Sequence, residues 1–189
     1  MVNDALNHLL NNAGQFSDQY ISELQKLLHD EIYTSRQIIH AAGQVELTLY
    51  LIKSGFARCY YYDRDGIEHT VKFCSKGDLV FSHEGYYKVP SFYYTEFMET
   101  SHAIALSYTD LIDLQKKFPE TSALVRYALM SNRKEEYERQ NILTLTAIER
   151  YQRLMKHNPN IFQKSPVKYI ASYLNMSRET LARLMGRKN

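Results

Sequence analysis

The side chains best suited to recognising a ligand form a short run near the C-terminus, Ser177-Arg178-Glu179-Thr180, with Arg183 shortly after it. A guanidinium group can donate two parallel hydrogen bonds to the O6 and N7 atoms of guanine, and a carboxylate can accept one from the N4 amine of cytosine. A solvated surface uses the same residue types. The side chains alone therefore leave two interpretations open, base reading and a solvated helix surface.

The residues around this run predict two short helices joined by a sharp turn. Pro166 suits the first turn of one helix. Asn175 tolerates the left-handed conformation that a sharp turn needs, and Ser177 can cap the second helix by accepting a backbone N–H. The residues that face inward in these two helices are Ile170, Ala171, Leu174, Leu181 and Leu184. The pattern is helix, turn, helix, with the second helix free to enter a groove of DNA.

Charge is divided unevenly along the chain. Residues 145–189 contain nine Lys and Arg against two acids, a net charge of +7, whereas residues 1–144 carry a net charge of −5. A basic end on an acidic body indicates an anionic partner that this end alone touches. Nucleic acid is the first candidate and a membrane surface the second.

The composition is that of an ordinary soluble globular protein. With 189 residues, 44% hydrophobic and 23% charged, the chain can form one domain with its own core plus a small second unit. No apolar run approaches the roughly 20 residues of a membrane-spanning helix, and the N-terminus lacks the features of a secretory signal. Two cysteines, Cys59 and Cys74, are too few for a secreted disulfide framework. We expect a cytoplasmic protein that does not enter a membrane.

The sequence pattern in the central part of the chain predicts short antiparallel strands. From residue 33 to 108, β-type runs are broken by turn signals about every ten residues, which predicts a small barrel or jelly roll. Asp65-Gly66 lies between aromatic and β-branched runs and predicts a hairpin with positive φ angles at both residues. Most of the sixteen tyrosines fall here. They fit half-buried strands, with a ligand-lining aromatic wall as the alternative.

Helical patterns flank this region. Residues 1–30 read as helical, with Ser17 as an N-cap, and the segment from Glu120 to about Leu145 lacks Pro and Gly and predicts one long helix. Within it, residues spaced by four and three form a seam: Ala123, Tyr127, Met130, Lys134, Tyr137, Asn141 and Thr144. Such a seam fits a coiled-coil partner. Packing against the protein's own barrel is the alternative, and both can hold along different parts of the helix.

The run IASYLNMSRETLARL resembles the helix-turn-helix of the Crp/Fnr family of bacterial transcription regulators. In that family an S-R-E-T-x-x-R pattern opens the recognition helix. The resemblance implies that Arg178, Glu179 and Arg183 read bases of a G·C-containing half-site, and that Ser177 and Thr180 contact phosphate. We expect further phosphate contacts from the basic residues Lys168, Arg187 and Lys188.

The remaining parts occur in the family's order. LIKSGFARCYYYDRDGIEHTVKF and KGDLVFSHEG are similar to its barrel hairpin and to the approach to its ligand cassette. The resemblance implies an α+β fold with N-terminal helices, a cyclic-nucleotide-binding-type jelly-roll barrel, a long dimerisation helix and a C-terminal helix-turn-helix. The expected units are residues 1–118 for the first two parts, 119–145 for the long helix and 146–189 for a DNA-binding domain. The chain stops about five residues after Leu184, so the family's β-wing is expected to be absent.

The family's nucleotide cassette is altered. Members that bind cyclic AMP carry a Gly-Glu pair and, ten residues after the Glu, an Arg followed by a small hydroxyl residue. Aligned from Gly77, the corresponding positions hold other residues, and Glu84 can serve only after a shift of two. The expected pocket positions are Phe81, Ser82, Glu84, Phe92 and Tyr93. Lys88 is the only cation among residues 86–98, and a buried phosphate without a cation is costly. We expect a filled pocket, or one for an apolar or aromatic effector.

The resemblance implies a homodimeric, effector-modulated transcription regulator that reads a palindromic site in double-stranded DNA and is not an enzyme. Its recognition helices would lie about 34 Å apart, the hinge near Leu145 would transmit an effector signal, and RNA polymerase is an implied further partner. No cofactor or metal is expected, since two cysteines are too few for an iron–sulfur cluster. The alternative is a barrel-based ligand-binding or protein-interaction module whose truncated tail no longer binds DNA specifically.

The altered cassette predicts that cyclic AMP does not bind in the family's way. Titration calorimetry of the purified protein with cyclic AMP is expected to give no saturable heat at micromolar concentrations, because residues 86–98 lack the arginine that pairs with the cyclic phosphate. A cyclic-AMP-binding member of the family serves as the positive control. Micromolar or tighter binding would contradict the prediction.

Overall fold

The computed structural model describes residues 4–186 of the chain. Two N-terminal helices, α1 (Asp4–Ala13) and α2 (Asp18–Leu27), precede the first strand. The Ser17 hydroxyl accepts a hydrogen bond from the backbone N–H of Tyr20, so the predicted N-cap of α2 is confirmed. Within the described residues, no helix combines the length and the apolar character that crossing a membrane requires.

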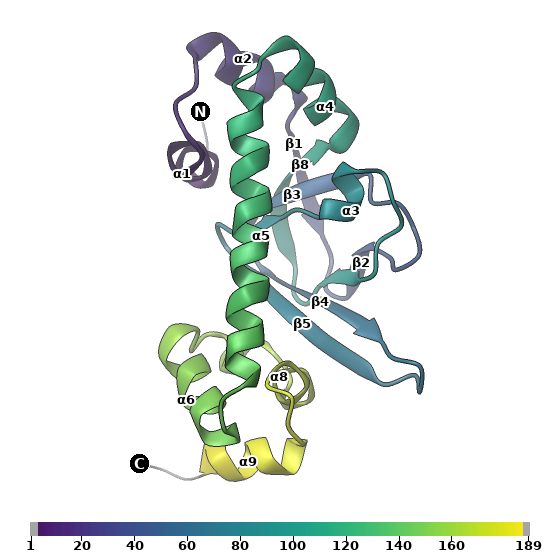
Figure 1. Ribbon diagram of the computed structural model, residues 1–189, viewed down its shortest axis with the longest axis vertical. Coiled ribbons are helices and arrows are strands. Elements are labelled where there is room, and N and C mark those ends of the chain that lie inside the picture. The colour runs from purple at the N-terminus through teal and green to yellow at the C-terminus, as the bar shows by residue number, and fades with distance from the viewer. Residues whose placement is uncertain (1–3, 187–189) are drawn as a thin grey trace.

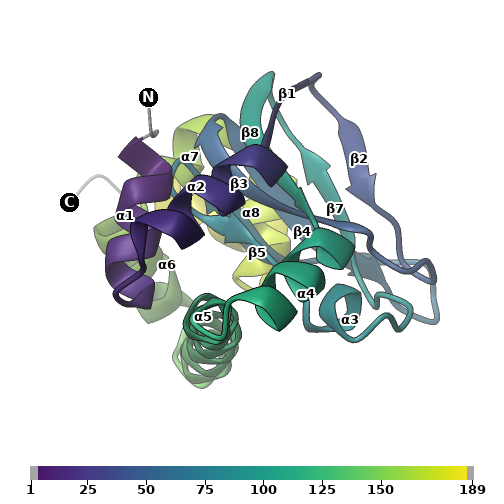
Figure 2. The same cartoon turned by 90° about the horizontal axis from the view of Figure 1, so that it is seen from above.

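Two four-stranded antiparallel sheets form the barrel (Figures 1 and 2). The first sheet has the order β1-β8-β3-β6 and consists of β1 (His29–Tyr33), β8 (Ser101–Ser107), β3 (Thr48–Ser54) and β6 (Leu79–Val80). The second has the order β2-β7-β4-β5 and consists of β2 (Gln37–His40), β7 (Tyr94–Phe97), β4 (Phe56–Tyr62) and β5 (Glu68–Ser75). The predicted α+β fold with an antiparallel barrel is confirmed.

Both sheets are covered on their outer faces, which creates three apolar cores. Because strand residues alternate between faces, Tyr50 and Ile52 of β3 enter the barrel interior while Leu49 and Leu51 face the helices. The outer face of the first sheet packs against α1, α2, α4 (Tyr108–Lys117) and α5 (Thr121–Leu143). The outer face of the second sheet packs against the C-terminal helices.

Helix α5 runs along the whole molecule, from α2 and α4 at one end to the C-terminal helices at the other (Figure 1). Its first half packs into the core through Leu124, Val125 and Ala128. Further along, the seam residues Met130 and Tyr137 are 64% and 63% exposed. The two predicted roles therefore suit different parts of one helix. The first half of α5 packs against the protein's own core, and its middle presents an exposed face that could contact a partner helix.

The hairpin between β4 and β5 is present, but its turn differs from the prediction. Gly66 has a φ of +76°, whereas Asp65 is not among the described residues with positive φ, so the expectation for Asp65 is wrong. The Asp63 carboxylate accepts backbone hydrogen bonds from Asp65 and Ile67, and the Asp63 carbonyl accepts one from Gly66. A longer loop of this kind needs only one left-handed residue.

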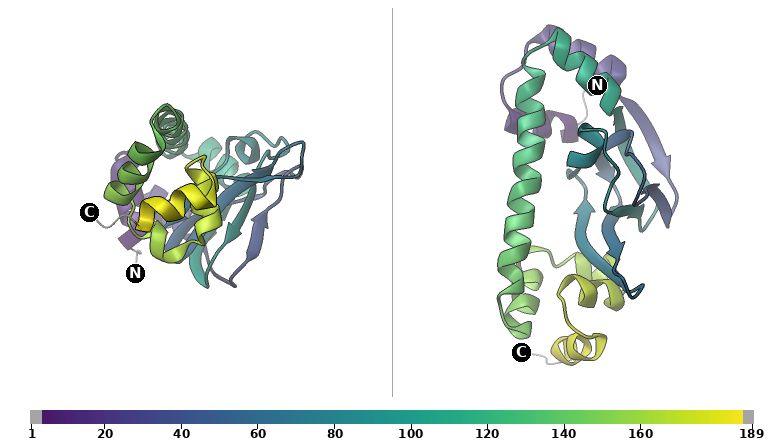
Figure 3. Two further views of the ribbon diagram at one scale, coloured as in Figure 1. Left: turned by 90° about the horizontal axis from the view of Figure 1, so that it is seen from below. Right: turned by 45° about the vertical axis from the view of Figure 1, so that its right-hand side comes forward.

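The remaining helices are short. One-turn helix α3 (His83–Tyr86) follows β6. After α5 the chain continues through α6 (Ala147–His157), α7 (Ile161–Lys164), α8 (Val167–Tyr173) and α9 (Arg178–Gly186). These four gather at the end of the molecule that lies opposite α2 and α4, as the right view of Figure 3 shows.

Gly55 in the β3–β4 connection predicts a sensitive position. It has a φ of +112°, and a Cβ atom there would lie 2.0 Å from Oγ and 2.7 Å from Cα of Ser101. Replacing it with alanine is expected to lower the free energy of unfolding by more than about 3 kcal/mol, through strain plus a backbone clash. Gly43→Ala is the control, because Gly43 also has positive φ but open space around it, and about 1–2 kcal/mol is expected. Urea denaturation measures both, and equal losses would contradict the clash.

Candidate nucleic-acid interface

The turn between α8 and α9 follows from one asparagine. Asn175 has a φ of +50°, as the sequence predicts for this turn. Its N–H donates to the Ser172 carbonyl and the next N–H, that of Met176, donates to the Ala171 carbonyl, which is the pair of bonds of a Schellman helix ending. From α6, Arg150 donates to the Asn175 carbonyl at 3.1 Å. The turn is therefore fixed from both sides.

Helix α9 begins with a hydroxyl cap. The Ser177 Oγ accepts a hydrogen bond from the backbone N–H of Thr180 at 3.1 Å and lies equally close to the Thr180 hydroxyl. The predicted capping role of Ser177 is thus confirmed. The same geometry gathers two hydroxyl groups at the helix N-terminus, where unpaired N–H groups attract anions such as phosphate.

Helix α9 presents charge on its outer side and leucine on its inner side. Leu181 and Leu184 are buried, together with the predicted inward residues Ile170, Ala171 and Leu174 of α8. The side chains of Arg178, Glu179 and Arg183 are exposed to solvent. Helix α9 lies at one end of the long axis of the molecule (Figure 1).

Electrostatics keeps this surface charged at neutral pH. The pKa of Glu179 is held below its usual value, mainly by a hydrogen bond with the backbone N–H of Glu179 and, to a smaller extent, by one with the Ser177 hydroxyl. The carboxylate therefore stays an acceptor, as pairing with a cytosine amine requires. On α8, Lys168 is exposed, with its Nζ 4.5 Å from the centre of the Tyr169 ring. Arg187 and Lys188, the other two expected phosphate contacts, lie outside the described residues.

Helix α8 is bound directly to the barrel. The Ser172 Oγ accepts a hydrogen bond from the Thr70 backbone N–H at 2.9 Å and donates one to the Glu68 carbonyl at 3.2 Å. The Ser172 hydroxyl thus pairs with one backbone N–H and one backbone carbonyl of β5, which is an edge strand. Arg139 of α5 donates to the carbonyls of Thr70 and Tyr173, so that α5, β5 and α8 meet at one guanidinium group.

A second guanidinium group, that of Arg58, occupies the centre of this contact. Arg58 is 1% exposed and projects from β4 on the outer face of the second sheet. It makes two hydrogen bonds to Glu68, of 2.7 and 3.0 Å, and one of 2.6 Å to Glu96. The Tyr169 ring of α8 covers it, with 3.5 Å from Cζ to the ring centre. We call Arg58, Glu68, Glu96 and Tyr169 the Arg58 cluster.

Two opposing effects, burial and hydrogen bonding, set the pKa of Arg58. Burial acts to lower it, but the hydrogen bonds that Arg58 donates to Glu68 and Glu96 outweigh burial and raise the pKa above the usual value. The cation is thus held permanently, with two carboxylates beside it and an aromatic face above it. The sequence reasoning missed the Arg58 cluster. Its only local signal is the hairpin, whose turn brings β5 back alongside β4.

Comparisons with known proteins agree with this architecture. No family model matches the chain. The anaerobic regulatory protein of Aggregatibacter actinomycetemcomitans is 28% identical over 166 residues, which are 80% of this chain and 63% of the relative. The fumarate and nitrate reduction regulatory protein of Vibrio cholerae is 30% identical over 170 residues, 80% of this chain and 65% of the relative. The chain spans about three fifths of the length of the first curated relatives it matches.

Solved structures share the fold. The structure of FixK2 from Bradyrhizobium japonicum has a TM-score of 0.74 at 14% identity, covering 85% of this chain and 83% of that one. A structure assigned to the Crp/Fnr family, from Eubacterium rectale, has a TM-score of 0.73 at 15% identity and covers 94% and 86%. The order of elements and the sequence relatives therefore agree. The chain is similar in sequence to these regulators and shares its fold with a structure from the Crp/Fnr family.

The expected pocket positions of the altered cassette lie in different surroundings. Phe81 is buried in the core beneath α1 and α5. The Ser82 hydroxyl caps α3 by accepting from the Gly85 N–H, and Glu84 is half-buried on that helix. Phe92 is 70% exposed, and Tyr93 stands edge-on to the Tyr61 ring. Phe81 and Phe92, which the sequence assigned to one pocket, therefore lie in different environments.

The barrel interior beside α5 is occupied by a polar link. Lys72 of β5 reaches α5, where its Nζ lies 2.5 Å from the Glu135 carboxylate and 3.4 Å from the Asn132 amide oxygen. Asn132 in turn donates to the Phe81 carbonyl at 2.8 Å. These side chains tie the barrel to α5 without a ligand. Lys72 lies outside residues 86–98, where the family resemblance places the cation, so the sequence pattern did not indicate its role.

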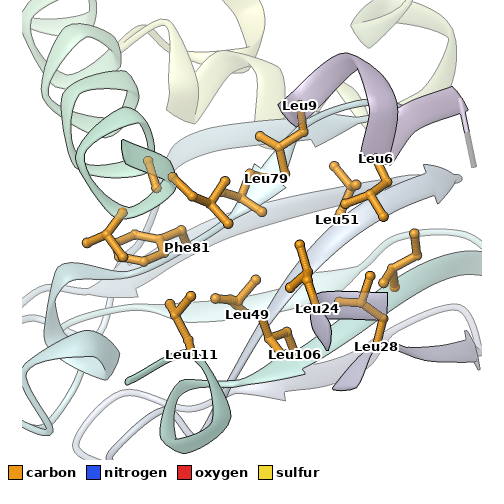
Figure 4. Close-up of a pocket in the computed structure, with 14 residues that line it drawn as sticks. Leu6, Leu9, Leu24, Leu28, Leu49, Leu51, Leu79, Phe81, Leu106 and Leu111 are labelled. Atoms are coloured by element: carbon orange, nitrogen blue, oxygen red, sulfur yellow. The ribbon is translucent and has the colours of Figure 1, made fainter. Parts of the chain in front are cut away.

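An apolar cavity of about 30 Å³ lies outside the barrel, between the first sheet and the helices (Figure 4). Leucines from α1, α2, β3 and α4 line the cavity. Of the five expected pocket residues, Phe81 is the one that also lines it. A cavity of this size and character stays dry, because it offers water no polar partners. Among the described residues, no three His, Cys, Asp or Glu side chains are grouped so as to hold a metal ion.

The Arg58 cluster predicts a large loss on truncation. Arg58→Ala leaves two mostly buried carboxylates without a cation, so the free energy of unfolding is expected to fall by about 3–5 kcal/mol. Adding Glu68→Gln and Glu96→Gln is expected to restore part of that loss, because amides need no counter-charge. Arg133→Ala is the control: Arg133 pairs with Glu136 on the exposed face of α5, and a change within about 0.5 kcal/mol is expected. Urea denaturation decides, and equal effects of the two arginine variants would contradict the analysis.

Proposed function

We propose that the protein is a homodimeric, sequence-specific DNA-binding transcription regulator of the Crp/Fnr type, and not an enzyme. The observation that carries the proposal is the outer side of α9, where Arg178, Glu179 and Arg183 are exposed on a capped, rigidly held helix. The regulatory names of the sequence relatives support it. Its setting would be the cytoplasm.

In this proposal α9 enters the major groove with its N-terminus first. Arg178 and Arg183 donate to guanine edges, and the ionised Glu179 accepts from cytosine. Ser177 and Thr180 bind phosphate at the helix start, and Lys168, Arg187 and Lys188 add charge contacts along the backbone. The net charge of +7 on residues 145–189 supports a phosphate partner.

The proposed dimer forms through the exposed face of α5. Met130 and Tyr137 are large, exposed and spaced by seven residues, which suits a helix-to-helix seam. Two copies related by a two-fold axis would present two α9 helices to a palindromic site in successive major-groove turns. The proposed units are residues 1–118 as sensor, 119–145 as dimer helix and 146–189 as DNA-binding domain. RNA polymerase is a further proposed partner.

The proposed sensor does not use cyclic AMP. The ion pair between Lys72 and Glu135 supports this, since Lys72, the cation that an anionic ligand would need, is already paired with a carboxylate. An effector, if the protein has one, would act by changing how the barrel holds α5 and α8.

DNA binding by single variants tests the function. On a duplex with two TGTGA-like arms, Arg183→Ala is expected to lose about 1–3 kcal/mol of binding free energy and to discriminate less at one base position. Lys168→Ala is the matched control: it is expected to weaken binding equally on all sequences and to reduce the salt dependence by about one counterion. Fluorescence anisotropy across several salt concentrations measures both.

The same titration separates the alternative. If wild type and Arg183→Ala bind specific and scrambled duplexes equally, base reading by α9 is wrong. The barrel-based ligand-binding or interaction module then becomes the better description.

A further inference from the structure

The two cysteines of the chain meet on the inner face of one hairpin. Cys59 of β4 lies opposite Lys72 of β5, and Cys74 lies two residues further along β5, opposite Ala57. Residues opposite each other in an antiparallel pair project to the same face, and diagonal neighbours are within reach of each other. Cys59 and Cys74 are therefore diagonal neighbours across the β4–β5 pair. Both are free thiols in the structure.

The two thiols differ in exposure and in charge. Cys74 is fully buried, whereas Cys59 is partly exposed and its sulfur lies 3.4 Å from the Thr95 hydroxyl. The hydrogen bond from Cys74, helped by the Lys72 ammonium group, lowers the pKa of Cys59 to about 7 against the effect of burial. The same bond and burial raise the pKa of Cys74. At neutral pH Cys59 is therefore partly ionised to the thiolate, beside a protonated partner.

Packing alone does not account for this arrangement. A buried cysteine such as Cys74 can serve as a small apolar residue in a barrel core. A lysine next to it is costly, and Lys72 is kept charged there by Glu135 of α5. Thiolate, ammonium and a second thiol together make a reactive environment: the sulfur of a partly exposed cysteine with a lowered pKa, next to a buried thiol that can resolve it.

We propose that Cys59 and Cys74 form a peroxide-reactive thiol pair that closes to an intramolecular disulfide. The Cys59 thiolate attacks a hydroperoxide: an S–O bond forms, the O–O bond breaks, and the leaving alkoxide takes a proton from solvent. Cys74 then attacks the Cys59 sulfenic acid: the S–S bond forms, the S–O bond breaks, and hydroxide leaves as water with the Cys74 proton. The two thiols lose two electrons, and the hydroperoxide is reduced to an alcohol and water.

The site lies on the inner face of the hairpin, and its chemistry does not depend on DNA binding. A disulfide needs its two Cα atoms within about 7 Å, which is close to the separation of about 7–8 Å that diagonal neighbours on paired strands have. The residue before Cys59 is Arg58, whose side chain lies on the opposite face in the Arg58 cluster.

Mass spectrometry of the reduced full-length protein tests the proposal. After a few equivalents of hydrogen peroxide at neutral pH, wild type is expected to lose two hydrogen atoms in mass and both maleimide-reactive thiols. A peptide joining Cys59 to Cys74 is expected in the non-reducing digest. Wild type that keeps two free thiols, or that forms only disulfide-linked dimers, overturns the proposal without reliance on any variant.

Two matched serine variants assign the roles. Cys74→Ser keeps a hydrogen-bond donor beside Cys59 and is expected to accumulate a sulfenic acid at Cys59 that dimedone traps. Cys59→Ser is expected to leave the Cys74 thiol unreacted under the same treatment. Oxidation of Cys74 in the second variant as fast as that of Cys59 in the first would show that the thiols are equivalent, which contradicts the proposed roles.

Discussion

Burying a guanidinium group costs several kcal/mol unless its N–H groups find acceptors. Arg58 meets this demand with side chains from neighbouring strands on both sides, Glu68 on β5 and Glu96 on β7, and with the ring of Tyr169 on α8. The strands must keep their register for the carboxylates to reach it, and α8 must stay docked to cover it. The position of the C-terminal helices on the barrel therefore depends on satisfying one buried cation.

Because side chains alternate along a strand, the register that serves Arg58 also fixes the other face. Shifting β4 by one residue would turn Cys59 outward and Arg58 into the barrel. The present register instead places Cys59, Lys72 and Thr95 side by side within the barrel wall. Lys72 continues to Glu135 on α5. The hairpin thus contacts α8 with one face and α5 with the other.

Features that depend on a few neighbouring residues could be predicted from the sequence. The turn at Asn175, the cap at Ser177 and the inward leucines Leu181 and Leu184 follow from local backbone preferences and helical spacing, and the structure has them in place. The strands and the long helix follow from periodicity, with helix α5 ending two residues before the predicted Leu145.

Features that depend on distant pairing could not be predicted in this way. The carboxylates around Arg58 come from positions 10 and 38 residues away, and no spacing rule identifies them. Two of the cassette positions have different surroundings, because the chain buries Phe81 in the core and leaves Phe92 exposed. The positive φ expected at Asp65 was wrong because the Asp63 carboxylate organises a longer loop.

The location of α9 at one end of the long axis has a kinetic consequence. Residues 145–186 carry a net charge of +5 and residues 4–144 one of −5, so the separated charges give the molecule an electric dipole directed along its length (Figure 1). A polyanion then exerts a torque that turns the basic end toward it before contact, and repels the acidic end. Orientation during diffusion is thereby biased toward encounters at α9, and this bias weakens as salt shortens the screening distance.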